Sequence, residues 1–326
     1  MARSQRSGLN GTAKEKNESQ HVTSQDSCML LQLPGETRNL IYSHLFTSTR
    51  LTFGERHISW SITKRMKPAP NSLAILRTCN LIKQEAGDLW LGQVLFNFEH
   101  AEDMLDKLSA LPLTTLSQIR HIRVGGYNMM LPLIGDHADV FQSFVWAPKL
   151  LPGLCLDTLS VLGASTGSHA YETLDWLVKY GNGWKELHYI TRNSAMLGFE
   201  MLNMPKEPQP STWHDVLIQR DGLDSGTSVT IYQSTQSNAP GTVVKRETRQ
   251  LFEQKPPSPE DLGKELLVIV KRGHRAHILE QDGPPKWTKG LTWAEIRDAP
   301  DFIEEDEDIE ADRYNDVDEY FWDPIH

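Results

Sequence analysis

The stretch LSVLGASTGSHAYETLDWLVKYGNGWKELHYI, residues 159–190, decides the fold class of this chain. It opens with a short apolar run at 159–162 and closes with a second at 187–190. Apolar residues recur between them at helical spacing, at Tyr171, Leu174, Leu177 and Val178. Ser168 can cap the start of this helix and Gly181 its end. A strand, a helix and a strand with short joints predict a right-handed parallel crossover.

The rest of the chain reads as helices first and strands later. Helical spacing occurs in four further segments, from residue 34 and at 73–89, 104–111 and 211–219. Strand-like runs occur at 51–53, 58–62, 119–124, 229–232, 243–245 and 266–270. The first two runs flank the Gly-containing segment 54–57, which predicts a hairpin loop there. We therefore expect a mixed α/β fold with a small parallel layer, for which a leucine-rich-repeat-like curve is one possible form.

Composition restricts the class of protein. The chain has 326 residues, 39% of them apolar and 23% charged, which is typical of a globular protein. No apolar run approaches the roughly 18 residues needed to span a bilayer, so we expect no membrane contact. Residues 1–27 resemble a disordered leader without a signal-peptide core, which favours the cytosol or nucleus. The odd number of cysteines, three, argues against a disulfide framework and a four-thiolate zinc site.

Charge is concentrated at the C-terminal end. The net charge is −10, but residues 301–326 carry twelve acidic residues and one arginine, so this tail contributes −11 and residues 1–300 about +1. Such a run resists collapse, so it is either a solubilising tail or an electrostatic arm for a basic partner. Neither end carries a basic stripe, which disfavours nucleic-acid binding. The expected domains are the leader 1–27, a helical region 28–124, an α/β body 125–300 and the acidic tail 301–326.

Two short blocks carry a resemblance to a known family. The first is LPGETRNLIYSHLF, residues 33–46, and the second is LRTCN, residues 76–80, followed by Ile82, Glu85, Ala86, Leu89 and FNF at 96–98. In this order they resemble the opening of the F-box-like domain found in many filamentous-fungal proteins. The resemblance covers roughly residues 30–124. About 25 residues, including the expected hairpin, stand between the two blocks, where a compact F-box has almost none.

The resemblance implies a protein-interaction module. F-box domains dock on the Skp1 adaptor and present a substrate protein to a cullin ubiquitin ligase, so this chain would be a substrate adaptor. The partner-binding residues would lie at the start of the first block, at Leu33, Pro34, Glu36, Ile41 and Leu45. The same apolar residues could instead pack the helices of the region together, since burial of such a side chain contributes roughly 1.5–3 kcal/mol without any partner.

One motif suggests catalysis instead. Gly163-Ala164-Ser165-Thr166-Gly167 is a G-x-S-x-G between a predicted strand and a predicted helix, the context of a nucleophile elbow. A serine hydrolase would use Ser165 with a later acid and then a histidine, and the residues in that order are Asp221 or Asp224 and His274 or His277. The alternative is that both glycines only shape a tight turn.

Other chemistry has little support in the sequence. His274 and His277 stand three residues apart, but no acid or cysteine stands at a matching offset, so we expect no metal site. Phosphate-binding glycine motifs are absent from the sequence, so we expect no cofactor. The leading function is therefore protein interaction; a serine hydrolase and a non-ligase scaffold with an acidic tail are the alternatives.

Overall fold

The computed structural model describes residues 28–59, 62–68, 71–132, 139–142, 144–163, 167–198, 210–223, 225–252, 263–279 and 290–298. The chain divides into two compact units, Met1–Ile41 and Tyr42–His326. The predicted leader 1–27 and acidic tail 301–326 lie outside the described residues. Each unit is considered by itself below.

Two helices stand at the start of the described chain. Helix α1 comprises Met29–Gln32, and helix α2 comprises Gly35–Thr47 and crosses the boundary between the units. Pro34 immediately precedes α2, and Glu36 lies in its first turn. A proline at a helix start sacrifices no hydrogen bond, and an acid there complements the helix dipole. The predicted helix from residue 34 is therefore confirmed.

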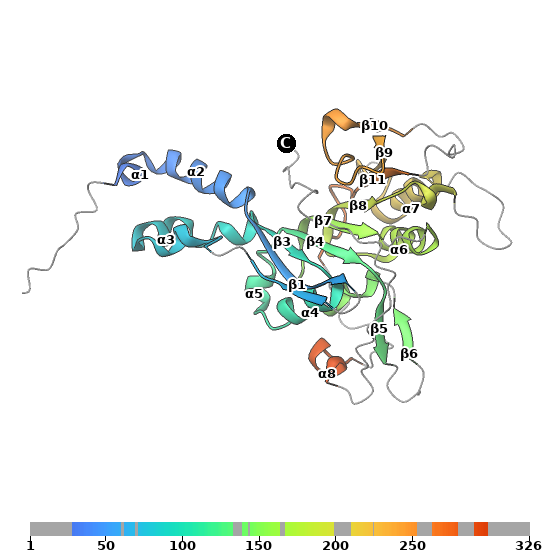
Figure 1. Ribbon diagram of the computed structural model, residues 1–326, viewed down its shortest axis with the longest axis horizontal. Coiled ribbons are helices and arrows are strands. Elements are labelled where there is room, and N and C mark those ends of the chain that lie inside the picture. The colour runs from blue at the N-terminus through green and yellow to red at the C-terminus, as the bar shows by residue number, and fades with distance from the viewer. Residues whose placement is uncertain are drawn as a thin grey trace, which may run out of the picture. The chain divides into compact units, whose positions relative to one another are not determined.

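The second unit is built on a nine-stranded sheet with the order β10-β9-β11-β8-β7-β4-β3-β1-β2 (Figure 1). Its strands are β1 (Arg50–Ser59), β2 (Ile62–Met66), β3 (Leu95–Phe98), β4 (His121–Gly126), β7 (Leu156–Gly163), β8 (Trp184–Thr191), β9 (Ser228–Ser237), β10 (Arg249–Leu251) and β11 (Lys264–Lys271). A separate two-stranded sheet pairs β5 (Met129–Pro132) with β6 (Asp139–Gln142). The mixed α/β class is thus confirmed.

Five strands form the parallel part of the sheet. Strands β1, β3, β4, β7 and β8 are parallel neighbours that follow one another in chain order. Helix α6 (Gly167–Tyr180) connects β7 to β8, so the crossover predicted over 159–190 is confirmed. Helix α4 (Ala101–Leu108) lies in the corresponding connection from β3 to β4. Right-handed crossovers between strands in chain order place their helices on one face of the sheet.

The covered face is apolar. One cross-strand row runs through Leu51, Phe96, Ile122, Leu159, Leu187 and Val270, and the next through Phe53, Phe98, Val124, Val161, Tyr189 and Val268. The buried apolar side of α6 and three buried residues of α4, Met104, Leu105 and Leu108, supply the other half of this core. Burial of about 1.5–3 kcal/mol per large side chain makes this layer the main source of stability.

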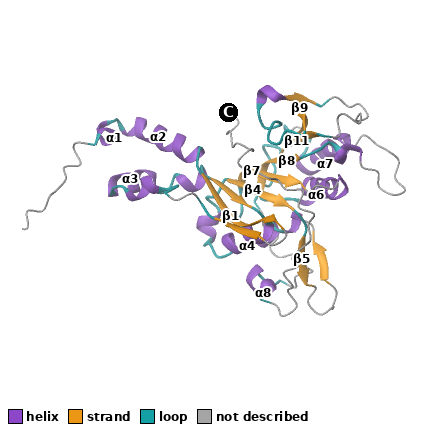
Figure 2. Ribbon diagram, in the orientation of Figure 1, coloured by secondary structure: helices purple, strands orange, loops and turns teal. Residues whose placement is uncertain are grey.

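Further helices complete the unit (Figure 2). Helix α7 (Pro210–Asp221) packs on α6, and the Trp213 indole nitrogen donates to Asp175 Oδ1 at 3.1 Å. The remaining helices are η2 (Ala74–Arg77), α3 (Asn80–Ala86), η3 (Trp90–Gly92), α5 (Leu113–Leu116), η4 (Phe144–Trp146), η5 (Pro148–Leu150), η6 (Ala195–Gly198), η7 (Arg246–Thr248) and α8 (Trp293–Arg297). The expected boundary between the helical region 28–124 and the α/β body 125–300 falls inside β4, which pairs directly with β7. The sheet is therefore continuous across this boundary.

The hairpin exists, but its loop was misplaced. Strands β1 and β2 pair antiparallel, with Ser59 opposite Ile62, and segment 54–57 lies inside β1. Gly54 has φ +110°, and a side chain at this position would collide with the Asp103 carboxyl of α4. The glycine is therefore needed for the close approach of a distant helix, and not for a turn.

Two further expectations about elements were wrong. The segment 243–245, predicted as a strand, is a turn, and its Val243 N–H donates to Glu265 Oε2 at 3.2 Å. The predicted helix 73–89 is broken into η2 and α3, because Cys79 adopts an extended conformation with φ −157°. The predicted parallel layer is present, and it contains five strands.

Membrane-spanning helices and metal-ligand clusters can be judged only for the described residues. In the described segments, no helix is both long and apolar enough to cross a bilayer. The same segments contain no cluster of three or more metal-ligating side chains. Cys28, Cys79 and Cys155 are free thiols.

Candidate functional site

The predicted partner-binding residues lie on and beside helix α2, and they are exposed. Leu33 is 36% exposed, and Ile41 and Leu45 are each 38% exposed. Pro34 and Glu36 are exposed as well. Large apolar side chains at this exposure gain only part of their burial free energy from the fold.

Helix α2 is fixed by a different set of side chains. Tyr42 and Phe46, one turn apart, are completely buried. The Tyr42 hydroxyl donates to Glu85 Oε2 of helix α3 at 3.2 Å. These two aromatic residues anchor the C-terminal half of α2 in the second unit, to which they belong.

A second set of contacts ties α1 to α2 within the first unit. The Arg38 guanidinium donates from its NH1 atom to the carbonyl of Leu33 at 2.5 Å and to that of Leu31 at 3.3 Å. The backbone N–H of Arg38 donates to the Pro34 carbonyl at 3.0 Å. The chain around Leu33 and Pro34 is therefore held in a defined conformation ahead of the helix.

The apolar residues of the first block differ in their exposure. Ile41 and Leu45 stand four residues apart, so they share one face of α2, beside the buried stripe of Tyr42 and Phe46. Ile82 of α3 is only 3% exposed and packs in the core, whereas Ile41 and Leu45 each keep 38% of their surface exposed. Leu33 and Ile41 in the first unit, and Leu45 in the second, are thus large apolar side chains with substantial exposure.

Sequence reasoning missed a second feature, a row of polar side chains on the sheet face opposite the apolar core. The register aligns Thr52, Asn97, Arg123, Ser160 and His188 on adjacent strands. Arg123 Nε donates to Asn97 Oδ1 at 2.7 Å, and Asn97 Nδ2 donates to Thr52 Oγ1 at 3.4 Å. Parallel strands covered on both faces are normally almost wholly apolar, so a polar row is notable here. The signal was the alternation of polar and apolar residues in β4 and β8.

Charged groups surround the His188 end of this row. The Glu186 carboxylate lies 2.7 Å from His188 Nε2 and 3.3 Å from Lys271 Nζ. Burial alone would raise the pKa of Glu186, but His188 and Lys271 outweigh that effect and hold the pKa below its usual value. One row away, burial lowers the pKa of His121 despite the nearby Asp157. Glu186 is therefore ionised at neutral pH.

The first glycine of the G-x-S-x-G motif, Gly163, ends β7, and the last, Gly167, begins α6, while Ser165 lies outside the described residues. Both flanking glycines have a packing reason. A Cβ on Gly163 would lie 2.8 Å from the Tyr189 ring and hydroxyl, and one on Gly167 would lie 3.0 Å from the Ala195 backbone. The tight packing of the crossover thus accounts for the two glycines without catalysis.

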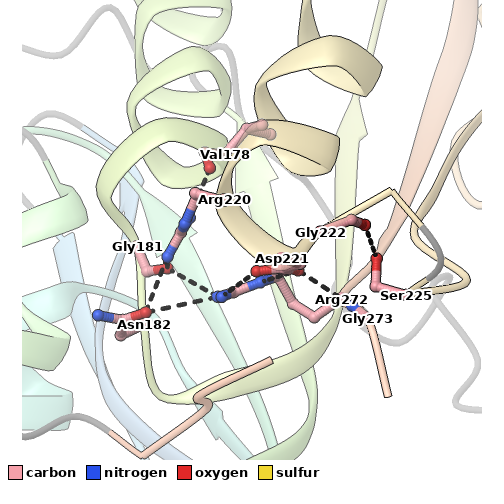
Figure 3. Close-up of polar contacts among 9 residues, drawn as sticks. All are labelled: Val178, Gly181, Asn182, Arg220, Asp221, Gly222, Ser225, Arg272 and Gly273. Carbon is pink, nitrogen blue, oxygen red and sulfur yellow. Dashed lines mark hydrogen bonds and ion pairs between the residues drawn. The ribbon is translucent and has the colours of Figure 1, made fainter. Parts of the chain in front are cut away.

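The acid proposed for a hydrolase is engaged in a buried ion pair (Figure 3). Asp221 accepts from Arg272 Nε and NH2, each at 2.8 Å, and from the Gly273 N–H at 3.0 Å. Burial would raise the pKa of Asp221, but these hydrogen bonds and the Arg272 charge lower it below its usual value. Arg220 donates from NH2 to the Gly181 carbonyl, joining α7 to the turn after α6. Asp221 therefore has a structural role.

The candidate histidines lie at the wrong edge of the sheet. Strand β11 is antiparallel to β8, with Leu266 opposite Thr191 and Lys271 opposite Glu186. His274 follows β11 and so lies near the amino-terminal ends of the parallel strands, where its Nδ1 is 2.5 Å from the Ser225 carbonyl oxygen. Gly163 ends β7 at the opposite edge. Five residues of strand separate the edges by about 17 Å, too far for a Ser–His hydrogen bond.

The other candidates add little to a catalytic site. His277 is exposed and follows His274 at the same edge, and Asp224 lies outside the described residues.

No protein-family model matches this chain, and neither the curated proteins nor the solved structures contain a significant match.

Proposed function

We propose that this chain is a protein-interaction module whose helix α2 docks on an adaptor of the Skp1 type, while the α/β body binds a substrate protein. The observation that carries the proposal is the exposure of Ile41 and Leu45 on a helix that Tyr42 and Phe46 hold in place. A helix anchored on one side and apolar on an exposed side fits the helix-in-groove mode of recognition.

The energetics are compatible with a specific complex. Complete burial of a Leu or Ile side chain contributes roughly 1.5–3 kcal/mol, and each of these residues retains a substantial exposed fraction. Burial of the remainder on binding is worth about 1 kcal/mol per side chain on this scale. Leu33 at the start of the helix adds a third apolar contact of similar exposure. The Arg38 hydrogen bonds around Leu33 reduce the ordering cost of that contact.

The test is binding of purified fungal Skp1 to the full chain and to two variants of it, one double and one single. We expect Ile41→Asp with Leu45→Asp to weaken binding by at least about a hundredfold, because it removes two apolar contacts and places two charges in the interface. The matched control is Leu113→Asp, a 62% exposed leucine of α5, which should bind as the wild type does. Absence of Skp1 binding, or equal binding by the double variant and the wild type, would refute the proposal.

A further inference from the structure

Strand β2 lies at the end of the sheet and has an open edge. It is the last strand in the sheet order, and its partner among the described strands is β1. In an antiparallel ladder every second residue directs its N–H and C=O groups away from the neighbouring strand. The outer edge of β2, about 17 Å long at 3.4 Å per residue, therefore presents backbone groups to which a further strand can bond.

Part of the β1–β2 hairpin extends beyond the rest of the sheet. Strand β3 pairs with β1 at residues 50–53, whereas β2 pairs with β1 from Gly54 to Ser59. Residues 54–59 and 62–66 thus form a two-stranded ribbon, for which the described residues supply no third strand. A two-stranded hairpin is at best marginally stable in water, so an added strand would stabilise this ribbon.

The ribbon carries an excess of positive charge. Residues 54–67 contain one acid, Glu55, and four permanently cationic residues, Arg56, Lys64, Arg65 and Lys67. Lys64, Arg65 and Lys67 are exposed. In the part of the chain that the structure describes, no ion pair engages Lys64 or Arg65. Consecutive residues of a strand point to opposite faces, so these two side chains place one positive charge on each side of the edge.

This charge decides which kind of strand fits the edge. A second copy of the chain would bring its own Lys64 and Arg65 against those of the first, and like charges on adjacent strands destabilise pairing. Exposed lysines on edge strands protect proteins against such self-association. A strand with acidic residues would instead form ion pairs across the edge while its backbone bonds to β2.

We propose that the outer edge of β2 binds an extended acidic segment of a partner protein as an added β-strand. The backbone of β2 supplies the hydrogen bonds, and Lys64 and Arg65 select acidic side chains at consecutive positions of the segment, one on each face. This docking surface includes no residue of α2, so it goes beyond the proposed adaptor function and is tested without Skp1.

The test measures binding of a fluorescent peptide to the full chain by fluorescence anisotropy. The probe is a short peptide of valine and threonine with two adjacent glutamates at its centre. Its control is the same peptide with a proline on each side of the glutamates, which keeps the charge but removes backbone N–H donors and disfavours a strand. A second control has lysines in place of the glutamates. Hydrogen–deuterium exchange reports whether the peptide protects the amides of residues 62–66.

Two variants of the chain with equal changes in net charge separate the edge from general electrostatics. Lys64→Glu with Arg65→Glu reverses both charges of the edge, and we expect it to weaken peptide binding at least about tenfold. The matched control, Lys83→Glu with Lys107→Glu, alters exposed lysines of α3 and α4 and should leave the affinity within about twofold of the wild type.

We expect the acidic peptide to bind at least about tenfold more tightly than the proline and lysine peptides, and to slow exchange in residues 62–66. Equal binding of the proline peptide would mean attraction by charge without an added strand and would overturn the proposal. Equal binding to the wild type and to the Lys64→Glu, Arg65→Glu variant would overturn it too, as would no binding at about 1 mM peptide.

Two other occupants of the edge are distinguished in the same assay. A short DNA duplex that binds more tightly than the acidic peptide would identify a nucleic-acid surface and overturn the proposal. Sedimentation of the chain without peptide measures pairing with a second copy. A dimer that the acidic peptide fails to dissociate, with residues 62–66 protected in it, would assign the edge to a second copy and overturn the proposal as well.

Discussion

Replacement of Asp221 by Asn tests the buried ion pair that joins α7 to the end of β11. The side chains of Arg272 and Asp221 are only 3% and 1% exposed. Asp221 accepts three hydrogen bonds, and Asn can replace at most part of them. Breaking a buried pair and leaving one charge behind costs about 3–5 kcal/mol, so we expect the free energy of unfolding to fall by about 3 kcal/mol.

The assay is urea unfolding at pH 7. With a slope of about 3 kcal/mol per molar urea, this loss lowers the midpoint by about 1 M. The matched control is Asp157→Asn, which breaks the exposed pair of Asp157 with Lys185 and should cost about 1 kcal/mol or less. Equal effects of the two variants would refute the reasoning that burial makes the Asp221 pair important.

The same pair predicts the acid dependence of stability. The folded pKa of Asp221 lies below the unfolded value of about 3.9. A group with a depressed folded pKa contributes its stability fully above the unfolded pKa and loses it as the pH falls through the folded pKa. Asn at this position has no such titration. The difference in stability between wild type and Asp221→Asn should therefore shrink below about pH 4.

Two further predictions concern the anchoring of α2 and the catalytic alternative. Phe46→Ala should lower the free energy of unfolding by about 3–5 kcal/mol, as measured by calorimetry. The control Leu40→Ala, at a 64% exposed site, should change it by about 0.5 kcal/mol or less. Similar losses of stability in the two variants would contradict the role of Phe46 as an anchor. A fluorophosphonate probe should not label Ser165, because the described histidines near Asp221 lie at the other edge of the sheet; labelling that disappears in Ser165→Ala would revive the hydrolase.

The sequence was sufficient for the crossover because its signals are local. The apolar runs that became β7 and β8 enclose one helical period, and no distant residue is needed to recognise it. The elements that were misread depend on distant partners. Gly54 was taken for a turn residue, yet the Asp103 carboxyl of α4 explains it. Segment 243–245 looked like a strand, yet the Glu265 carboxylate holds it as a turn.

In the candidate site, too, local signals were readable from the sequence, whereas contacts with distant residues were not. The first block indicated a helix with exposed or buried apolar residues, and periodicity alone could not decide between them. Tyr42 and Phe46 are the buried residues because they contact parts of the chain that are distant in sequence. Tyr42, for example, bonds to Glu85, 43 residues away. The polar positions of β4 and β8 were visible in the sequence, but only the strand register aligns Arg123 with His188 in one face.

Hydrogen–deuterium exchange of the full chain, with and without purified Skp1, tests the central claim most directly. The account predicts that Skp1 slows exchange in residues 35–47 and leaves the amides of β7 and β8 unchanged. Exchange that is the same with and without Skp1, or protection confined to residues outside α2, would contradict it.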